Sequence, residues 1–336
     1  MRTAEFIENK RISGERIKMK IVVLDGYTLN PGDLSWDELK RMGTTVIYDR
    51  TSPEELSERI LDAEIVLTNK VVLSAETIAG ASRLKYIGIL ATGVNVVDLQ
   101  AARDRRIPVT NIPAYSTESV VQFTWAHLLN LVSGIVHNAN SVQRGEWCSS
   151  PDFSYTRTPL TELAGKTLGI IGLGTIGRRV AEIAVAFGMN VLAYGPHLKV
   201  GDSLGKVRFV ELETIFRESD VVSLHCPLKA DNKGMVNAAR LAMMKPGSFL
   251  INTARGPLLD ETAVAEALNC GRLGGLGADV LSTEPPKADN PLLKAKNVFL
   301  TPHNAWATLD ARKRLMAILL ENILAFLGGT PRNVVN

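Results

Sequence analysis

The glycine-rich stretch Gly172-Leu-Gly-Thr-Ile-Gly177 constrains the fold more than any other feature of this sequence. An apolar run at residues 167–171 precedes it, and an apolar helical face follows it as far as Gly188. This context is typical of a dinucleotide-binding strand–turn–helix, in which the first glycine forms the turn, the second lets a pyrophosphate approach and the third lets helix and strand pack closely. The alternative is a turn that serves helix packing alone, and the context favours a nucleotide.

Short apolar runs recur along the chain with helical stretches between them, which predicts parallel βαβ units. Because 336 residues exceed the usual size of one domain, we expect two. The fold class is therefore α/β, with two Rossmann-like or flavodoxin-like doubly wound parallel-sheet domains and a cleft between them. The expected strands of the first series are 20–24, 64–67, 86–90 and 107–110, with helices at 52–61 and 75–81, and those of the second series are 167–171, 190–194, 207–210, 220–224, 248–252, 276–280 and 298–301.

Two longer helices are expected outside these units. Residues 117–136 are apolar on most faces, which predicts a buried helix that can also pack across domains or subunits. Residues 309–327 form a final helix, and Gly328 and Gly329 end it.

Composition excludes several function classes. The 38 basic and 35 acidic residues are spread along the chain, so we expect no nucleic-acid partner, and no apolar run reaches the length that spans a membrane. Cys148, Cys226 and Cys270 are widely spaced, which indicates neither a disulfide framework nor a zinc site and fits a reducing cytoplasm. Residues 1–18 mix charges without an apolar core, so this N-terminal extension is not a signal peptide.

The sequence lacks the acidic residue that is expected to bind the adenosine ribose. An acidic residue about 20 positions after the glycines usually binds the ribose hydroxyls, but no carboxylate lies between Glu182 and Asp202. His197 and Lys199 lie in this interval and can pair with a 2′-phosphate, or they can be solvated loop residues. This part of the sequence therefore does not decide between NAD(H) and NADP(H) as the cofactor.

Three ionisable residues follow three different strands of the second series: Arg255, Glu284 and His303. Ligands bind beyond the carboxyl ends of parallel strands, so we expect all three in one cleft. A reduced nicotinamide transfers hydride to a carbonyl carbon, and His303 would protonate the resulting alkoxide. Glu284 would hydrogen-bond the other ring nitrogen and favour the charged imidazolium, while Arg255 would bind a substrate carboxylate in its planar fork.

Each of these residues has a structural alternative. Taken singly, Arg255 is more often a surface ion pair, Glu284 a loop carboxylate and His303 a histidine satisfied by backbone. Their joint position downstream of a nucleotide turn favours the catalytic interpretation. No second histidine or cysteine lies at ligand spacing from His303, so we expect no metal. His127 and His137 are interpreted as packing or surface residues.

Together, Gly172–Gly177, Asn252-Thr-Ala-Arg-Gly256, Asp279–Pro285 and Pro302-His303 resemble the D-isomer-specific 2-hydroxyacid dehydrogenase family, from about Lys20 to the C-terminus. The resemblance implies that the arginine binds the substrate carboxylate, that the histidine is the acid and base, and that the glutamate is its partner. We expect NAD(H) in preference to NADP(H). The residues implied at the cofactor are Gly172, Gly174, Thr175, Ile176, Gly177, His225, Pro227, Thr253, Ala254 and Asp279.

Further positions and boundaries follow from the same resemblance. Asp279 matches the residue that binds the nicotinamide carboxamide. His225 comes before Cys226-Pro227 at another strand end, and its position there makes us expect that its backbone lines the cofactor groove. Gly93 and Val94 match a loop whose amides hold the substrate carboxylate. The implied substrate domain comprises residues 19–113 and 304–336, with the dinucleotide-binding domain, 114–303, inserted between them. A homodimer is implied, built largely around the helix near residues 117–137.

Within the family, four segments look like the glycerate dehydrogenase and hydroxypyruvate reductase branch: 145–147, 152–155, 159–163 and 303–306. We therefore expect an NAD(P)-dependent oxidoreductase that interconverts hydroxypyruvate and D-glycerate. Asn304 stands where a small apolar residue is commoner, which leaves a dehydrogenase for another 2-hydroxy acid as an alternative. A nucleotide-sensing corepressor-like protein is the other. A phosphoglycerate dehydrogenase with a regulatory domain is disfavoured, because the sequence stops soon after the final helix.

Overall fold

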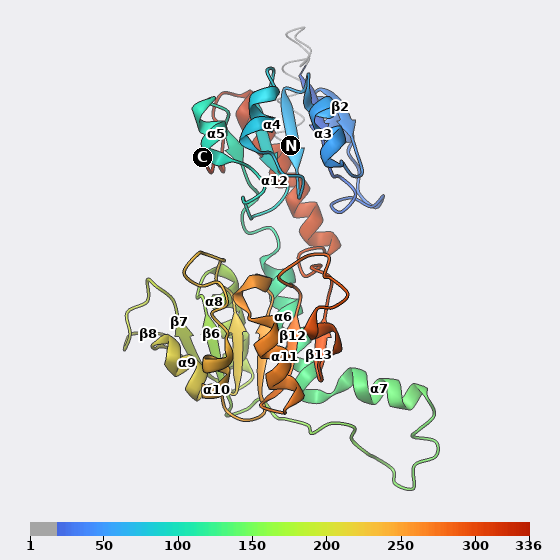
Figure 1. Cartoon of the computed structure of the whole chain (residues 1–336), viewed down its shortest axis with the longest axis vertical. Helices are drawn as coiled ribbons and strands as arrows, with labels where there is room; N and C mark the ends of the chain where they lie inside the picture. Colours follow the sequence, from blue (N-terminus) through green and yellow to red (C-terminus); the bar gives the residue numbers. More distant parts are fainter. Residues whose placement is uncertain (1–18) are drawn as a thin grey trace. The chain divides into compact units, whose positions relative to one another are not determined.

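The computed structural model describes residues 19–336, so the expectation for the N-terminal extension lies outside it (Figure 1). The chain forms two compact units. The described part of the first comprises residues 19–116 and 307–336, and the second comprises residues 117–306. The boundaries expected from sequence were at 113 and 303. Both units are α/β with mainly parallel sheets, which confirms the predicted fold class.

The first unit contains a five-stranded parallel sheet in the order β2-β1-β3-β4-β5, the flavodoxin-like arrangement. The central strands are buried on both faces, which explains why the sequence shows them as continuous apolar runs. The strands are β1 (Lys20–Val23), β2 (Thr44–Ile47), β3 (Ile65–Thr68), β4 (Tyr86–Ile89) and β5 (Val109–Thr110). The helices are α2 (Asp37–Met42), α3 (Pro53–Ile60), α4 (Ala75–Gly80), α5 (Leu99–Asp104) and α12 (Leu309–Leu327).

The closing helix, α12, is part of this first unit although it comes last in the chain. Arg312 is buried and donates to both carboxylate oxygens of Asp33 at 2.6 Å and to the Leu29 carbonyl at 3.1 Å. Asn322 donates to the Asn111 carbonyl at 3.0 Å. These bonds join the end of the chain to segments near its beginning.

The second unit contains an eight-stranded sheet in the order β13-β12-β11-β10-β6-β7-β9-β8, in which only β8 and β9 pair antiparallel. Its order from β9 to β12 is that of a Rossmann sheet. The strands are β6 (Thr167–Ile171), β7 (Asn190–Tyr194), β8 (Ser203–Leu204), β9 (Val207–Phe209), β10 (Val221–Leu224), β11 (Ser248–Asn252), β12 (Leu273–Ala278) and β13 (Val298–Leu300). The helices are α6 (Thr117–Ser133), α7 (Ile135–Gln143), α8 (Thr175–Ala186), α9 (Leu212–Glu218), α10 (Ala238–Met243) and α11 (Glu261–Asn269).

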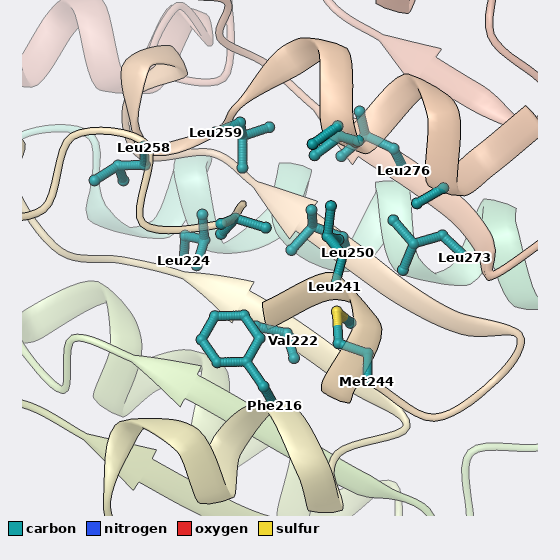
Figure 2. Packing of buried hydrophobic residues seen from close by; sticks show 14 of the residues in the cluster. Phe216, Val222, Leu224, Leu241, Met244, Leu250, Leu258, Leu259, Leu273 and Leu276 are labelled. Atoms are coloured by element: carbon teal, nitrogen blue, oxygen red, sulfur yellow. The ribbon is translucent and has the colours of Figure 1, made fainter. Parts of the chain in front are cut away.

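Apolar layers cover both faces of this sheet. On one face, side chains of α9, α10 and α11 pack against β10, β11 and β12, among them Phe216, Leu241 and Leu250 (Figure 2). On the other face, α6 and α8 contribute Trp125 and Val180. Because the strands are held between two layers, the loops at their carboxyl ends start from fixed positions.

The predicted single helix over residues 117–136 is wrong. α6 ends at Ser133, Gly134 adopts a left-handed conformation with φ +58°, and α7 begins at Ile135 with a bend of 64°. Glycine favours this conformation, which ends a helix. In Figure 1, α7 and the irregular segment after it extend beyond the sheet of the second unit.

None of the helices between residues 19 and 336 could by itself cross a membrane; only α6 and α7 taken together, despite their bend, satisfy the criteria of length and apolar composition.

Candidate active site

The nucleotide turn has a distinct geometric reason for each glycine. Gly172 has φ +100°, and a Cβ there would lie 2.7 Å from the Cys226 nitrogen. A Cβ on Gly177 would overlap the Gly172 carbonyl oxygen. Gly174 is the N-cap of α8, and a Cβ there would meet no heavy atom of residues 19–336 within 4 Å, its chain neighbours aside. Two glycines therefore allow close packing, and the middle one leaves open space beside the first turn of α8.

This space can accept a phosphate. A pocket of ≈ 550 Å³ lies there, bordered by Gly174, Thr175 and Arg178 together with Thr117, Glu118, Leu173, Arg179 and Glu182. The amides in the first turn of α8 and the positive end of its dipole favour an anion at this position. Arg178 Nε donates to the Leu173 carbonyl at 3.2 Å, which holds its cationic side chain beside the turn. The residues present therefore fit a dinucleotide pyrophosphate.

His225 and Pro227 follow β10, the strand next to β6 in the sheet. The backbone of His225 lies against Gly172, and its amide donates to the Ile171 carbonyl at 2.8 Å. The ring Nε2 lies 2.8 Å from Ser223 Oγ. Burial lowers the pKa of His225 to about 4, so the ring is neutral at pH 7. This arrangement presents the His225 backbone at the nucleotide turn, and its contact with a cofactor stays a prediction.

His303 and Glu284 meet directly. His303 Nδ1 lies 2.5 Å from Glu284 Oε2, and the side chains are 27% and 33% exposed. Glu284 Oε1 accepts the Leu281 amide at 3.1 Å, which fixes the carboxylate from its other oxygen. The pair engages Nδ1, so Nε2 is the ring nitrogen that remains to exchange a proton with a ligand.

The backbone of His303 is strained. Its φ is +52°, a left-handed conformation that costs energy for any residue with a Cβ. Asp279, which directly follows β12, offsets this cost. Its Oδ1 accepts the Asn304 amide at 3.0 Å, and its Oδ2 accepts the Ala305 amide at 2.9 Å. Asp279 thereby holds the two residues that follow His303.

Asp279 itself is buried, and burial raises the pKa of its carboxyl, while hydrogen bonds from Thr301 and from the amides of Ala305 and Asn304 oppose that shift. Thr301 Oγ1 lies 2.5 Å from Asp279 Oδ1. The family resemblance implied Asp279 at the nicotinamide, and that contact stays a prediction. Its role in holding the His303 turn was not foreseen.

The loop of Arg255 is set by Asn252, a fully buried residue at the end of β11. Asn252 Oδ1 accepts the Ala254 amide at 3.1 Å, and its Nδ2 donates to the Arg255 carbonyl at 2.9 Å. Thr253 Oγ1 lies 2.9 Å from Thr124 Oγ1 of α6. The Arg255 side chain is exposed, and its Nη1 donates to the Ala254 carbonyl at 2.7 Å. The loop is ordered while its guanidinium faces solvent.

Gly256 connects this loop with that of Glu284. A Cβ on Gly256 would overlap the backbone of Leu281 and Ser282, so the two loops lie in direct contact. The structure thus brings the Arg255 loop against the segment that leads to Glu284, and Glu284 against His303. Asn252 was part of a recognised motif but had no expected role, because a polar residue at a strand end looks in sequence like the start of a solvated loop.

Other predicted positions lie elsewhere. Gly93 and Val94 belong to the first unit, in the loop after β4, and their contact with a substrate carboxylate stays a prediction. His197 and Lys199 lie in the exposed loop after β7. Among residues 19–336 no group of three or more histidine, cysteine or acidic side chains is arranged to hold a metal ion.

Comparison with known proteins places the chain. The family described as D-isomer specific 2-hydroxyacid dehydrogenase, NAD binding domain, matches residues 125–305. A hydroxypyruvate reductase of Blautia hydrogenotrophica is 48% identical over 321 residues, which are 95% of this chain and 100% of that protein. The chain belongs to the D-isomer-specific 2-hydroxyacid dehydrogenase family.

Other members of the family support the branch. A glycerate dehydrogenase of Methylorubrum extorquens is 44% identical over 291 residues, covering 86% of this chain and 90% of that one. Together these two relatives place this 2-hydroxyacid dehydrogenase in the glycerate dehydrogenase and hydroxypyruvate reductase branch, as its sequence predicted.

Solved structures show the same fold with either cofactor. An acyclic imino acid reductase in complex with NADPH and D-Arg has a TM-score of 0.84 and 32% identity, covering 95% of this chain and 100% of that one. A D-lactate dehydrogenase from Aquifex aeolicus, complexed with NAD and lactic acid, has a TM-score of 0.79 and 31% identity, with 92% and 96% covered. A nicotinamide cofactor is therefore common to this dehydrogenase and its structural neighbours.

Proposed function

We propose that this dehydrogenase interconverts hydroxypyruvate and D-glycerate, with residues 117–306 binding the dinucleotide and the first unit supplying the substrate loop. The observation that carries the proposal is the 2.5 Å pair of His303 and Glu284. This pair follows strands of the same sheet whose β6 leads into the nucleotide turn. Ligands bind at the carboxyl ends of such strands, so the acid and the cofactor share one edge.

His303 acts as acid in reduction and as base in oxidation. When bound, the reduced nicotinamide supplies hydride to the carbonyl carbon of the 2-keto acid. The carbonyl oxygen gains negative charge, and His303 Nε2 donates a proton to it, giving the 2-hydroxy acid. In the reverse direction the neutral ring accepts that proton. Glu284 keeps the ring oriented through Nδ1 and stabilises the imidazolium by its charge.

Arg255 binds the substrate carboxylate, because its guanidinium offers two parallel N–H donors to a carboxylate. Gly93 and Val94 complete this binding through their amides. Thr253 and Ala254 border the cofactor through their ordered backbone, and Asp279 receives the carboxamide. The family resemblance implies these roles, and the ordered Arg255 loop supports those of Thr253, Ala254 and Arg255.

NAD(H) is the favoured cofactor, and NADP(H) is accepted as well. β7 ends without a carboxylate that would repel a 2′-phosphate, and the loop after it carries the exposed cationic or neutral side chains His197 and Lys199. A 2′-phosphate would pair with Lys199 at little cost. The imino acid reductase complexed with NADPH shares this fold.

The test is a spectrophotometric panel of 2-keto acids with NADH and with NADPH, followed through the absorbance of the reduced nicotinamide. Hydroxypyruvate should give the highest kcat/KM. His303→Asn should lower kcat by about 10²–10⁴-fold while dinucleotide binding, measured by calorimetry, is retained. A protein that binds dinucleotide but oxidises it with no 2-keto acid would contradict the proposal and favour a nucleotide-sensing protein.

We also propose a homodimer in which α7 and the segment after it contact a second copy. Six large apolar side chains are exposed on this stretch, and contiguous exposed apolar surface marks an interaction site. They are Ile135, Val136, Val142, Trp147, Phe153 and Leu160. A second copy is the occupant that the family favours.

A further inference from the structure

Three buried polar side chains lie on α6, a helix that is otherwise mostly apolar: Ser119, Thr124 and His127. A buried polar group destabilises a protein unless it is hydrogen-bonded. Each of these three is bonded, and each has a partner that lies just after a different strand or turn of the candidate site.

The partners of these three side chains lie in different parts of the candidate site. Thr124 bonds to Thr253 in the Arg255 loop. His127 Nε2 lies 3.1 Å from Thr301 Oγ1, directly after β13. Ser119 Oγ donates to the carbonyl of Ala305, beyond His303. Helix α6 thus contacts two of the three loops that carry the proposed catalytic residues, those of Arg255 and His303.

The directions of the two hydrogen bonds made by the Thr301 hydroxyl can be assigned. Thr301 has one hydroxyl proton but two polar neighbours, Asp279 Oδ1 at 2.5 Å and His127 Nε2 at 3.1 Å. A carboxylate only accepts, and the shorter bond is typical of a hydroxyl that donates to it. Thr301 therefore donates to Asp279 and accepts from His127, whose proton is on Nε2. Burial lowers the pKa of His127, which keeps this ring neutral and leaves Nδ1 without a proton.

We propose that Thr301, oriented by His127, is a positioning residue for the reaction. It fixes the carboxylate of Asp279, and Asp279 in turn fixes the two amides that follow His303. Those amides hold the left-handed turn that directs the His303 ring. Without the Thr301 hydroxyl, Asp279 loses one of its three donors and the turn loosens. Because displacement of a reacting group by about 1 Å can lower a rate by about 10²-fold, the effect appears in turnover.

This inference rests on the proposed function, and a pair of variants at one position tests it. Thr301→Val keeps the shape of the side chain but removes the hydroxyl, whereas Thr301→Ser keeps the hydroxyl. Thr301→Val should lower kcat at least about 10-fold, on the order expected for a displaced acid, with the KM for hydroxypyruvate changed less than about 3-fold. Thr301→Ser should recover most of that loss, and thermal denaturation should show that both variants are folded.

A second position separates the role of Thr301 from a general loosening of the core. Thr124→Val removes a buried hydroxyl of the same helix that bonds to the Arg255 loop instead. It should mainly raise the KM for the keto acid. His127→Leu, which removes the donor behind Thr301, should lower kcat in the same direction as Thr301→Val, and His127→Gln should restore part of it.

The His303 ring gives a readout that does not need turnover. Its Cε1–H resonance, assigned by its loss in His303→Asn, should shift or broaden in Thr301→Val and stay near the wild-type position in Thr301→Ser. An unchanged resonance with kcat within about twofold of wild type would overturn the positioning role. Failure of the wild type to oxidise NADH with any 2-keto acid would instead remove the proposed function, so the two failures are distinguishable.

Discussion

In the proposed mechanism Glu284 acts through the ring of His303, so a substitution at Glu284 tests the effect of its charge separately from the loss of the ring itself. Glu284→Gln keeps an acceptor near Nδ1 but removes the negative charge that stabilises the imidazolium. We expect kcat to fall about 10–100-fold, the usual cost of losing an orienting carboxylate behind a functional histidine, with little change in KM for the keto acid. Steady-state kinetics at fixed pH measure this.

A matched control lies nearby. Glu261 accepts hydrogen bonds from the backbone and side chain of Ser282, both at 2.7 Å, in the loop that carries Glu284. Glu261→Gln keeps one acceptor oxygen for the Ser282 amide and places an NH₂ group from which the Ser282 hydroxyl can accept, so kcat should stay closer to wild type than in Glu284→Gln. Equal kcat losses in the two variants would show that loop order, and not the charge at His303, accounts for the effect.

At the scale of residues, the sequence indicated the candidate catalytic residues but not the side chains that support them. His303, Glu284 and Arg255 could be found because ionisable side chains follow successive buried strands. Thr301 and the buried polar residues of α6 could not, because their contacts join residues far apart in sequence; Thr124 and Thr253 are 129 residues apart. No local pattern encodes such a contact. Asn252 has near partners, Ala254 and Arg255, but a polar residue at a strand end looks in sequence like the start of a solvated loop.

At the scale of elements, two glycines of the nucleotide turn have different roles: one serves ligand binding and the other serves folding. Gly174→Ala places a methyl group in open space, so the free energy of unfolding should stay within about 1 kcal/mol of wild type, the intrinsic difference between glycine and alanine in ordered backbone. Dinucleotide binding should weaken, because the methyl group occupies the approach of the pyrophosphate. Calorimetric titration with NADH measures the second effect and urea unfolding the first.

Gly177→Ala is the contrasting variant. Its methyl group would meet the Gly172 carbonyl oxygen, which is backbone and cannot rotate away. We expect this overpacking to lower the free energy of unfolding by about 1–3 kcal/mol. If Gly174→Ala destabilised the protein as much as Gly177→Ala while binding NADH normally, the assignment of the two glycines would be wrong.

The elements themselves were predicted unevenly. Strands β6, β7 and β11 and helix α12 have the bounds expected from sequence, because each is a clear apolar run or period with a turn or glycine at its end. β2 was missed, since it is a half-buried edge strand beginning with two threonines. β12 starts before its predicted position, because its glycines obscure the apolar pattern. Those glycines are needed there: a Cβ on Gly275 would lie 2.5 Å from Leu131 of α6.

At the scale of the whole molecule, the exposed apolar side chains of the α7 segment predict that two copies associate. The wild type should sediment with twice the 36.5 kDa mass of one chain. Replacing Val142 and Phe153 by aspartate should lower the measured mass, because Phe153 is 90% exposed in the single chain and a partner would have to bury it. Analytical ultracentrifugation over a range of concentrations measures the dissociation.

Leu61→Asp is the control for this test. Leu61 is 63% exposed but belongs to the first unit, whereas the α7 segment belongs to the second. The Leu61 variant should keep the mass of the wild type. A wild type that sediments as a single chain at micromolar concentration, or a Leu61 variant that dissociates equally, would contradict the proposed dimer.

The path of the chain has a consequence for biosynthesis. The first unit needs α12, whose Arg312 bonds to Asp33 and whose Leu319 is fully buried. Residues 19–116 therefore leave the ribosome long before their final helix exists, whereas the inserted unit is complete as soon as its own strands have emerged. The segment that is translated first must wait, with part of its apolar surface uncovered, until the C-terminal helix arrives to close it.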